Sequence, residues 1–151
     1  MYSTTKFLVC VLLLFSCTVK HPTNQKGNPK DTAANSSLLN ILNNFRIVNR
    51  YDLSYTIGFA GSTSQQIVGY KKLLKIRDTS KLIEALYIEK NPVAKLYLYQ
   101  ALVFKKVTLP KDIITSLTND STKVAFLEGC IGGMGSVKEL IHRKSNVFRR
   151  L

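Results

Sequence analysis

The sequence contains no tryptophan, only two histidines and only three cysteines among its 151 residues. His21 and His142 lie near opposite ends of the chain, and the sequence therefore shows no cluster of the ligands that zinc prefers. Cys10, Cys17 and Cys130 are too few and too scattered for a disulfide framework. We therefore expect no metal site, no cofactor and no fold held together by disulfides.

Residues that could carry catalysis are also scarce. There are nine acidic residues, most of them next to Lys or Arg and near predicted helix starts, where capping explains them. Cys130 lies in the apolar stretch 126–131 and is expected to be a small buried hydrophobic residue. The glycines between 129 and 135 follow no predicted strand, and Ser136 precedes Lys138, the reverse of a phosphate loop. We expect them to end a helix and allow a turn, and we expect no enzymatic activity.

Long apolar runs are absent except at the start of the chain. Phe7–Phe15 is continuously apolar and follows Lys6. Nine residues of helix span only about 13–14 Å, whereas the hydrocarbon core of a bilayer is about 30 Å thick. A basic start followed by a short apolar centre is typical of an export signal and not of a membrane-spanning helix.

The residues Leu14-Phe15-Ser16-Cys17 resemble a lipobox, the motif cut by the lipoprotein signal peptidase. Leu14, Ser16 and Cys17 match this motif, whereas Phe15 departs from it because that position is usually small. The resemblance implies cleavage between Ser16 and Cys17 and a thioether-linked diacylglycerol on Cys17, often with a third acyl chain. Two or more acyl chains anchor a protein stably. The resemblance to a lipobox also implies that the protein lies on the exported side of the cell membrane or outer membrane. Plain secretion and a cytosolic location are the alternatives.

The composition divides the chain into three parts. Residues 1–16 are the predicted signal peptide, and residues 17–35 are the predicted lipidated cysteine and polar tether, with Pro22, Gly27 and Pro29. Such a segment buries too little apolar surface to offset its ordering entropy. Residues 36–151 are the predicted folded domain, whose size allows folding without disulfides.

The apolar periodicity from Ser36 onward is mostly helical and predicts an all-α domain. Leu38, Leu39, Ile41, Leu42 and Phe45 form one predicted face. Asn91-Pro92 is a strong start signal, in which Asn caps the helix and Pro takes its first position. Residues 50–61 alternate in a strand-like way, but a single strand has no partner. We therefore interpret that stretch as a helix end and a loop.

An internal repeat refines this expectation. Six mostly apolar positions between Leu82 and Leu96 recur 31 residues later, between Ile113 and Leu127. A short helix, a polar turn and a longer helix at this period are typical of an α-solenoid. Asn91, Pro92 and Val93 resemble the turn of a HEAT repeat. The resemblance implies a short HEAT-like array with a concave surface that binds proteins or peptides, and a plain helical bundle is the alternative fold.

Basic residues outnumber acidic ones by 22 to 9. Cleavage before Cys17 removes Lys6 alone, so the mature side chains carry 22 − 1 − 9 = +12. Such a charge favours anionic partners, although it also serves solubility alone. The basic tail is a candidate contact with anionic lipid or a solvated helix end; it comprises Arg143, Lys144, Arg149 and Arg150.

These observations together predict a membrane-anchored lipoprotein of the bacterial cell envelope that acts as a non-enzymatic binding or scaffold module. Its expected partners are the membrane, through the lipid anchor, and a protein or peptide on the helical surface. The alternative is a cytosolic basic helical protein that binds nucleic acid. Export would separate the protein from most nucleic acid, so no nucleic-acid partner is expected for the lipoprotein.

Overall fold

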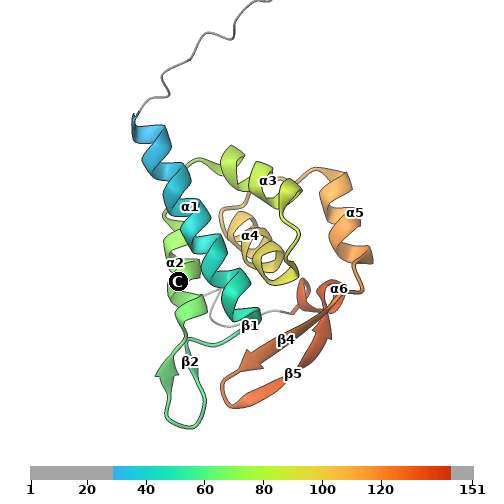
Figure 1. Ribbon diagram of the computed structural model, residues 1–151. Coiled ribbons are helices and arrows are strands. Elements are labelled where there is room, and N and C mark those ends of the chain that lie inside the picture. Colours follow the sequence, from blue (N-terminus) through green and yellow to red (C-terminus); the bar gives the residue numbers. More distant parts are fainter. Residues whose placement is uncertain (1–28, 144–151) are drawn as a thin grey trace, which may run out of the picture.

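The computed structural model describes residues 29–143, and its side chains are described from Ser36 onward (Figure 1). Within this range the chain forms six helices and two small sheets. In chain order these are α1 (Pro29–Val48), β1 (Arg50–Asp52), β2 (Thr56–Ile57), β3 (Ser62–Thr63), α2 (Gln65–Leu74), α3 (Thr79–Ile88), α4 (Pro92–Phe104), α5 (Lys111–Asn119), β4 (Lys123–Glu128), β5 (Ile131–Ser136) and α6 (Val137–Leu140). The domain is therefore mixed α/β, and the prediction of an all-α fold is wrong.

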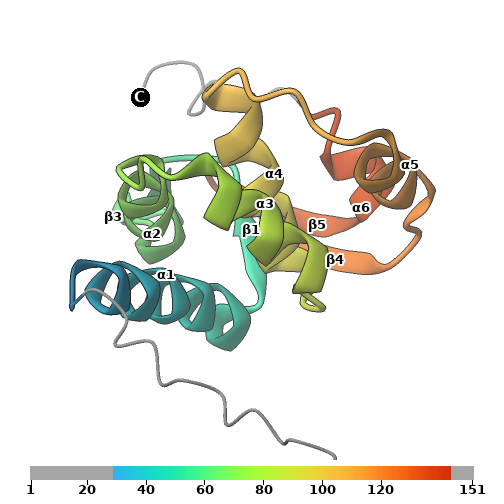
Figure 2. The ribbon, with the colours of Figure 1, turned by 90° about the horizontal axis from the view of Figure 1, so that it is seen from above.

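Helix α4 is the centre of the domain. It packs against α1, α2, α3, α6 and β1, and Figure 2 shows helices and strands on several sides of it. A helix surrounded in this way must be apolar over most of its circumference. Its buried apolar residues are Val93, Ala94, Leu96, Tyr97, Leu98, Ala101 and Leu102. The predicted start is confirmed, because the Asn91 side chain accepts the Ala94 N–H at 3.0 Å and Pro92 is the first helical residue.

Helix α1 begins at Pro29, within the segment that we interpreted as the tether. Its inner face is largely as expected, since Leu38, Ile41, Leu42 and Phe45 are buried. Leu39 is 55% exposed and does not belong to that face. The same stretch therefore provides both the first helix and one wall of the core.

Four aromatic rings join α1, β1 and α2 to the central helix. Phe45 stacks on Tyr97 with ring centroids 4.3 Å apart, and the Tyr51 ring lies edge-on to Tyr97 at 4.9 Å. Tyr70 of α2 lies 5.9 Å from the same ring. All four are fully buried. The Tyr97 hydroxyl accepts the Asp52 N–H at 2.8 Å and donates to the Asp52 carbonyl at 3.2 Å, so that α4 also holds the backbone of β1.

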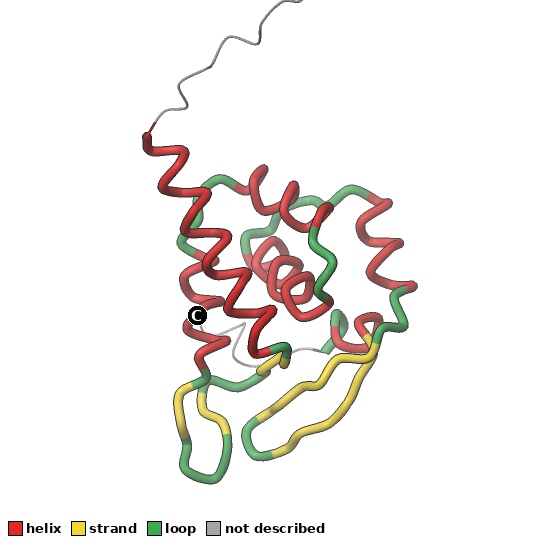
Figure 3. The backbone as a smooth tube through the Cα atoms, viewed as in Figure 1, coloured by secondary structure: helices red, strands yellow, loops and turns green. Residues whose placement is uncertain are grey.

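The three-stranded sheet has the order β1-β4-β5 (Figure 3). Strand β1 pairs in parallel with β4, with Arg50 opposite Ala125, and β4 pairs antiparallel with β5. The strand-like alternation in residues 50–61 was therefore a correct signal, and our interpretation of that stretch as a helix end was wrong. The partner of β1 lies far downstream, in a segment for which we predicted a helix.

The HEAT-like repeat is also wrong. The first repeat unit is a true helix pair, α3 and α4, but in the second unit α5 is followed by β4 instead of a second helix. Val124 and Leu127 have the i, i+3 spacing of a helix, whereas Val124 and Phe126 have the i, i+2 spacing of a strand, so this segment fits both periods. The glycines at 129, 132, 133 and 135 weaken a helix by about 1 kcal/mol each relative to alanine. In the structure Gly129 adopts a positive φ of 62° in the β4–β5 turn, a conformation that glycine favours.

Candidate functional site

Only one of the site residues that we predicted from sequence, Arg143, lies within the described residues. Ser16, Cys17, Lys144, Arg149 and Arg150 lie outside the described residues. Arg143 is exposed and forms an ion pair with Glu128 at 3.3 Å. Its guanidinium also lies over the Phe126 ring, 4.2 Å from the centroid. Arg143 is therefore engaged with the β4 strand.

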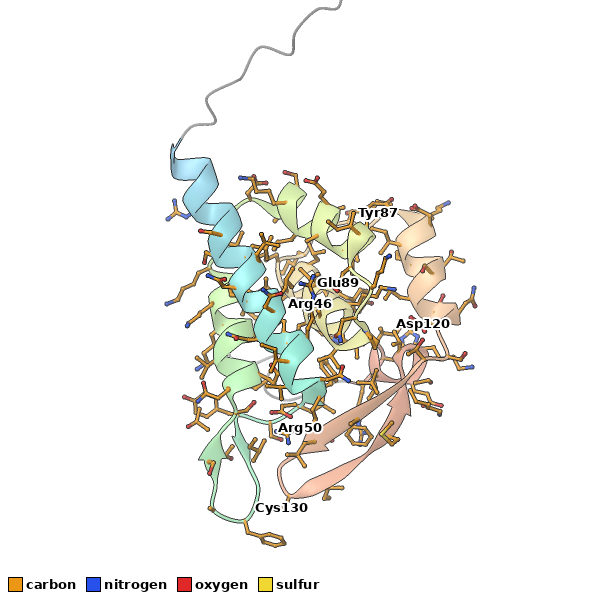
Figure 4. The ribbon with its side chains drawn as sticks, viewed as in Figure 1. Arg46, Arg50, Tyr87, Glu89, Asp120 and Cys130 are labelled. Carbon is orange, nitrogen blue, oxygen red and sulfur yellow. The ribbon has the colours of Figure 1, made fainter. Side chains whose placement is uncertain are left out.

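Cys130 is exposed in the turn between β4 and β5, and the prediction that it is buried in an apolar helix is wrong (Figure 4). The apolar stretch around it forms a hairpin whose tip extends away from the core. His142 is exposed after α6. Within residues 29–143, no group of three or more His, Cys, Asp and Glu side chains is placed to hold a metal ion. None of the described helices combines the length and apolar character needed to cross a membrane.

One buried acidic residue, Asp52, lies where β1, α2 and α4 meet. Its carboxylate accepts Arg50 Nε at 2.7 Å, Arg50 Nη2 at 3.2 Å and Ser64 Oγ–H at 2.6 Å. Ser64 in turn caps α2 by accepting the Ile67 N–H at 3.2 Å. The hydrogen bond to Asp52 raises the pKa of Arg50. Both Asp52 and Ser64 are completely buried, so this cluster holds elements together and is closed to a substrate.

A second buried carboxylate joins α1 to the turn between α3 and α4. Glu89 accepts Arg46 Nη2 at 2.7 Å and Arg46 Nε at 3.3 Å, and Figure 4 shows the two side chains meeting. The Glu89 carboxylate also accepts the backbone N–H groups of Lys90 and Asn91 at 3.0 and 2.9 Å. With all of these partners inside the fold, the ion pair has a structural role.

The most distinctive surface is formed by two hairpins that lie side by side at one end of the domain (Figure 1). Gly58 N–H donates to the Gly129 carbonyl at 3.1 Å, and Gly129 N–H donates to Ser54 Oγ at 2.8 Å. These two hydrogen bonds hold the β2–β3 hairpin against the tip of the β4–β5 hairpin. The start of α1 lies at the opposite end of the domain.

Large apolar side chains are exposed on this hairpin end. Phe59 is 100% exposed, Ile131 is 72% exposed and Met134 is 63% exposed. Ile131 and Met134 lie on opposite faces of β5, because side chains alternate along a strand. Both faces of β5 therefore expose a large apolar side chain at this end of the domain. Sequence reasoning missed these residues because it assigned the region to helices and loops.

Strand β5 also has an open edge. It is the last strand in the order β1-β4-β5, and within residues 29–143 no other strand pairs with its outer side. Its sequence from Ile131 to Ser136 contains three glycines and no charged residue or proline, the groups that usually protect an edge strand. The free backbone groups of such an edge can pair with an extended segment of another chain. We call β5 and the exposed residues Phe59, Ile131 and Met134 the hairpin surface.

Comparisons with protein-family models, with curated proteins and with solved structures found no match to this chain.

Proposed function

We propose that the protein is a membrane-anchored lipoprotein of the bacterial cell envelope and acts as a non-enzymatic binding module. The short apolar run and the lipobox-like Leu14, Ser16 and Cys17 support the anchor. The closed hydrogen bonding of Asp52 and Glu89 supports a binding role over a catalytic one. The binding surface proposed below is not a HEAT-like array, because the described chain does not form one.

The observation that carries the binding role is the hairpin surface. It combines an unprotected, glycine-rich edge with fully exposed Phe59. A partner in an extended conformation would hydrogen-bond to the β5 backbone while its side chains contact Phe59 and Ile131. Because α1 starts at the other end of the domain, an anchor attached before α1 joins the domain at the end opposite this surface (Figure 1).

Site-specific photo-crosslinking in a bacterial host tests the binding role. A photoreactive residue at Ile131 is expected to give a discrete crosslinked protein band, and the same residue at exposed Thr115 on α5 is not. Adding Gly132→Lys introduces a charge at the edge and should abolish the band. A Cβ at Gly132 lies 3.5 Å from the nearest side-chain atom, so the strand itself accommodates the change. Equal bands at both positions, or a band that survives Gly132→Lys, contradict the proposed surface.

The anchor is tested separately by intact mass and cell fractionation of the full chain and of Cys17→Ala. We expect the wild type to lose residues 1–16, gain a diacylglyceryl mass and sediment with membranes. The variant should lack the added mass and the membrane association. A wild-type protein that is soluble and begins at Met1 would contradict the lipoprotein assignment and would favour the cytosolic alternative.

A further inference from the structure

A basic groove lies between the middle of α1, the end of α2 and the beginning of α3. Its volume is about 510 Å³. It is lined by residues that include Leu38, Lys72, Lys75, Arg77, Asp78 and Lys81. The four cations come from two helices and the loop between them, and they share one depression with a single carboxylate.

Three of these cations have no ion-pair partner in the described part of the chain. Among the described residues no carboxylate lies within ion-pair distance of Lys72, Lys75 or Arg77, and all three are exposed. Like charges gathered at this spacing raise the local positive potential and attract anions. The groove is therefore electrostatically unsatisfied within the described part of the chain.

The one acidic group in the groove is already engaged. Asp78 caps α3 by accepting Ser80 Oγ–H at 2.5 Å and the Ser80 N–H at 3.1 Å, and Lys81 Nζ lies 3.9 Å from its other oxygen. The beginning of α3 is thus occupied by its own cap. An incoming anion would be held by the lysine and arginine side chains and not by the helix N-terminus.

The groove lies toward the end of the domain where α1 begins, opposite the hairpin surface (Figures 1 and 2). A membrane-facing role for this end rests on the proposed lipid anchor at Cys17. Eleven residues, 18–28, separate Cys17 from α1. That length spans at most about 36–40 Å when fully extended. An anchored chain therefore joins the domain at the end where the basic groove lies.

The chemistry of the groove also fits a membrane surface. Ile76 is partly buried beside the cations, Leu38 lies buried beneath them, and Leu39, the next residue of α1, is exposed. Phospholipid head groups combine phosphate anions with adjacent glycerol and acyl carbons. A basic residue near an anionic leaflet strengthens binding by about fivefold, and the effect falls off within a Debye length of the surface.

We propose that this groove binds the phosphates of anionic phospholipids and so orients the anchored domain, with the hairpin surface directed away from the bilayer. The lipid anchor supplies attachment, and the groove supplies orientation. Sequence reasoning placed the lipid contact on the basic tail instead. The sequence shows a dense run of basic residues from Lys71 to Lys81, but it does not show that this run packs next to α1.

Vesicle flotation of the full mature chain carrying Cys17→Ala tests the groove without the acyl anchor. The vesicles contain phosphatidylglycerol and phosphatidylcholine, or phosphatidylcholine alone. The groove variant is Lys72→Gln/Lys75→Gln/Arg77→Gln. The matched control, Lys90→Gln/Lys111→Gln/Lys138→Gln, removes the same charge from exposed positions elsewhere. Circular dichroism and thermal unfolding verify that both variants fold.

We expect binding only to the anionic vesicles, with a loss on the order of a hundredfold for the groove variant and at most about fivefold for the control. Equal losses for the two variants would overturn the proposal, because charge alone would then explain binding. Release by inorganic phosphate at constant ionic strength would replace it with a free-anion site. Groove-dependent binding of a single-stranded oligonucleotide without vesicle binding would replace it with nucleic-acid recognition.

The vesicle assay does not depend on lipidation, so the two proposals fail separately. If intact mass shows that wild-type Cys17 is not lipidated, but the groove still binds vesicles, the lipoprotein proposal is wrong and the lipid-site proposal stands. If Cys17 is lipidated, but the groove variant binds vesicles as well as the unsubstituted groove does, the lipoprotein proposal stands and the lipid-site proposal is wrong.

Discussion

Replacing Gly69 by alanine should lower stability even though alanine is the better helix former. A Cβ at Gly69, inside α2, would lie 2.8 Å from Phe45 Cε1 and 3.3 Å from its Cζ. The Phe45 ring is fully buried and stacked on Tyr97 at 4.3 Å, so it has little room to retreat. Overpacking of this kind costs about 1–3 kcal/mol, whereas Gly to Ala in a helix gains about 1 kcal/mol. The free energy of unfolding should therefore fall by about 0–2 kcal/mol.

Replacing the Phe45 ring by a smaller side chain should reverse the sign of the Gly69→Ala effect on stability. In a Phe45→Leu background the added methyl fills part of the vacated space, and Gly69→Ala should then stabilise by up to about 1 kcal/mol. Urea unfolding of the wild type, both single variants and the double variant gives a coupling energy, expected to be about 1–3 kcal/mol. Thr115→Ala on exposed α5 is the control and should behave alike in both backgrounds. A stabilising Gly69→Ala in the wild-type background would refute the close approach of α1 and α2.

Three further perturbations concern the carboxylates of Glu89 and Glu139 and two buried tyrosines. Glu89→Gln weakens charge-assisted hydrogen bonds and should lower the free energy of unfolding, measured in urea, by about 1–3 kcal/mol. The Ser136 N–H lowers the pKa of Glu139, so Glu139 stabilises the fold above the unfolded-state pKa of about 4.3, and this contribution is lost as the pH falls through the lower folded-state pKa. Glu139→Gln should therefore lower the free energy of unfolding at neutral pH and have no effect at low pH, and a pH-independent loss would contradict this. Burial raises the pKa of Tyr51 and Tyr97; stability should hold below about pH 10 and fall above it, and these two tyrosines should ionise together with unfolding and not before.

Local signals predicted local structure well. The Asn91-Pro92 start of α4 depends on neighbours within one turn, and it is confirmed. Ser64 caps α2 by accepting the Ile67 N–H. Asp78 likewise caps α3, because its carboxylate reaches the Ser80 and Lys81 N–H groups.

The sheet could not be derived in the same way. Residues 50–52 alternate like a strand, but a strand is stable only when its backbone groups pair, and the partner is β4. The apolar spacing in β4 suits a helix equally well. Pairing of Tyr51 with Phe126 resolves both ambiguities at once, since each segment supplies the hydrogen bonds that the other lacks. That misassignment also hid the exposure of Cys130 and the open edge of β5.

The amino-acid order alone accounts for the basic charge, the apolar centre of α4 and the residues at its start, because these follow from composition and short-range contacts. The lipobox-like start belongs to the same class of local signal and stays a prediction. The arrangement of the two hairpins, the engagement of Asp52 and the meeting of α1 with Lys72 and Arg77 depend on chain segments that are distant in sequence. Long-range pairing decides them, because hydrogen-bond partners and charge neighbours are set by where the backbone places each segment.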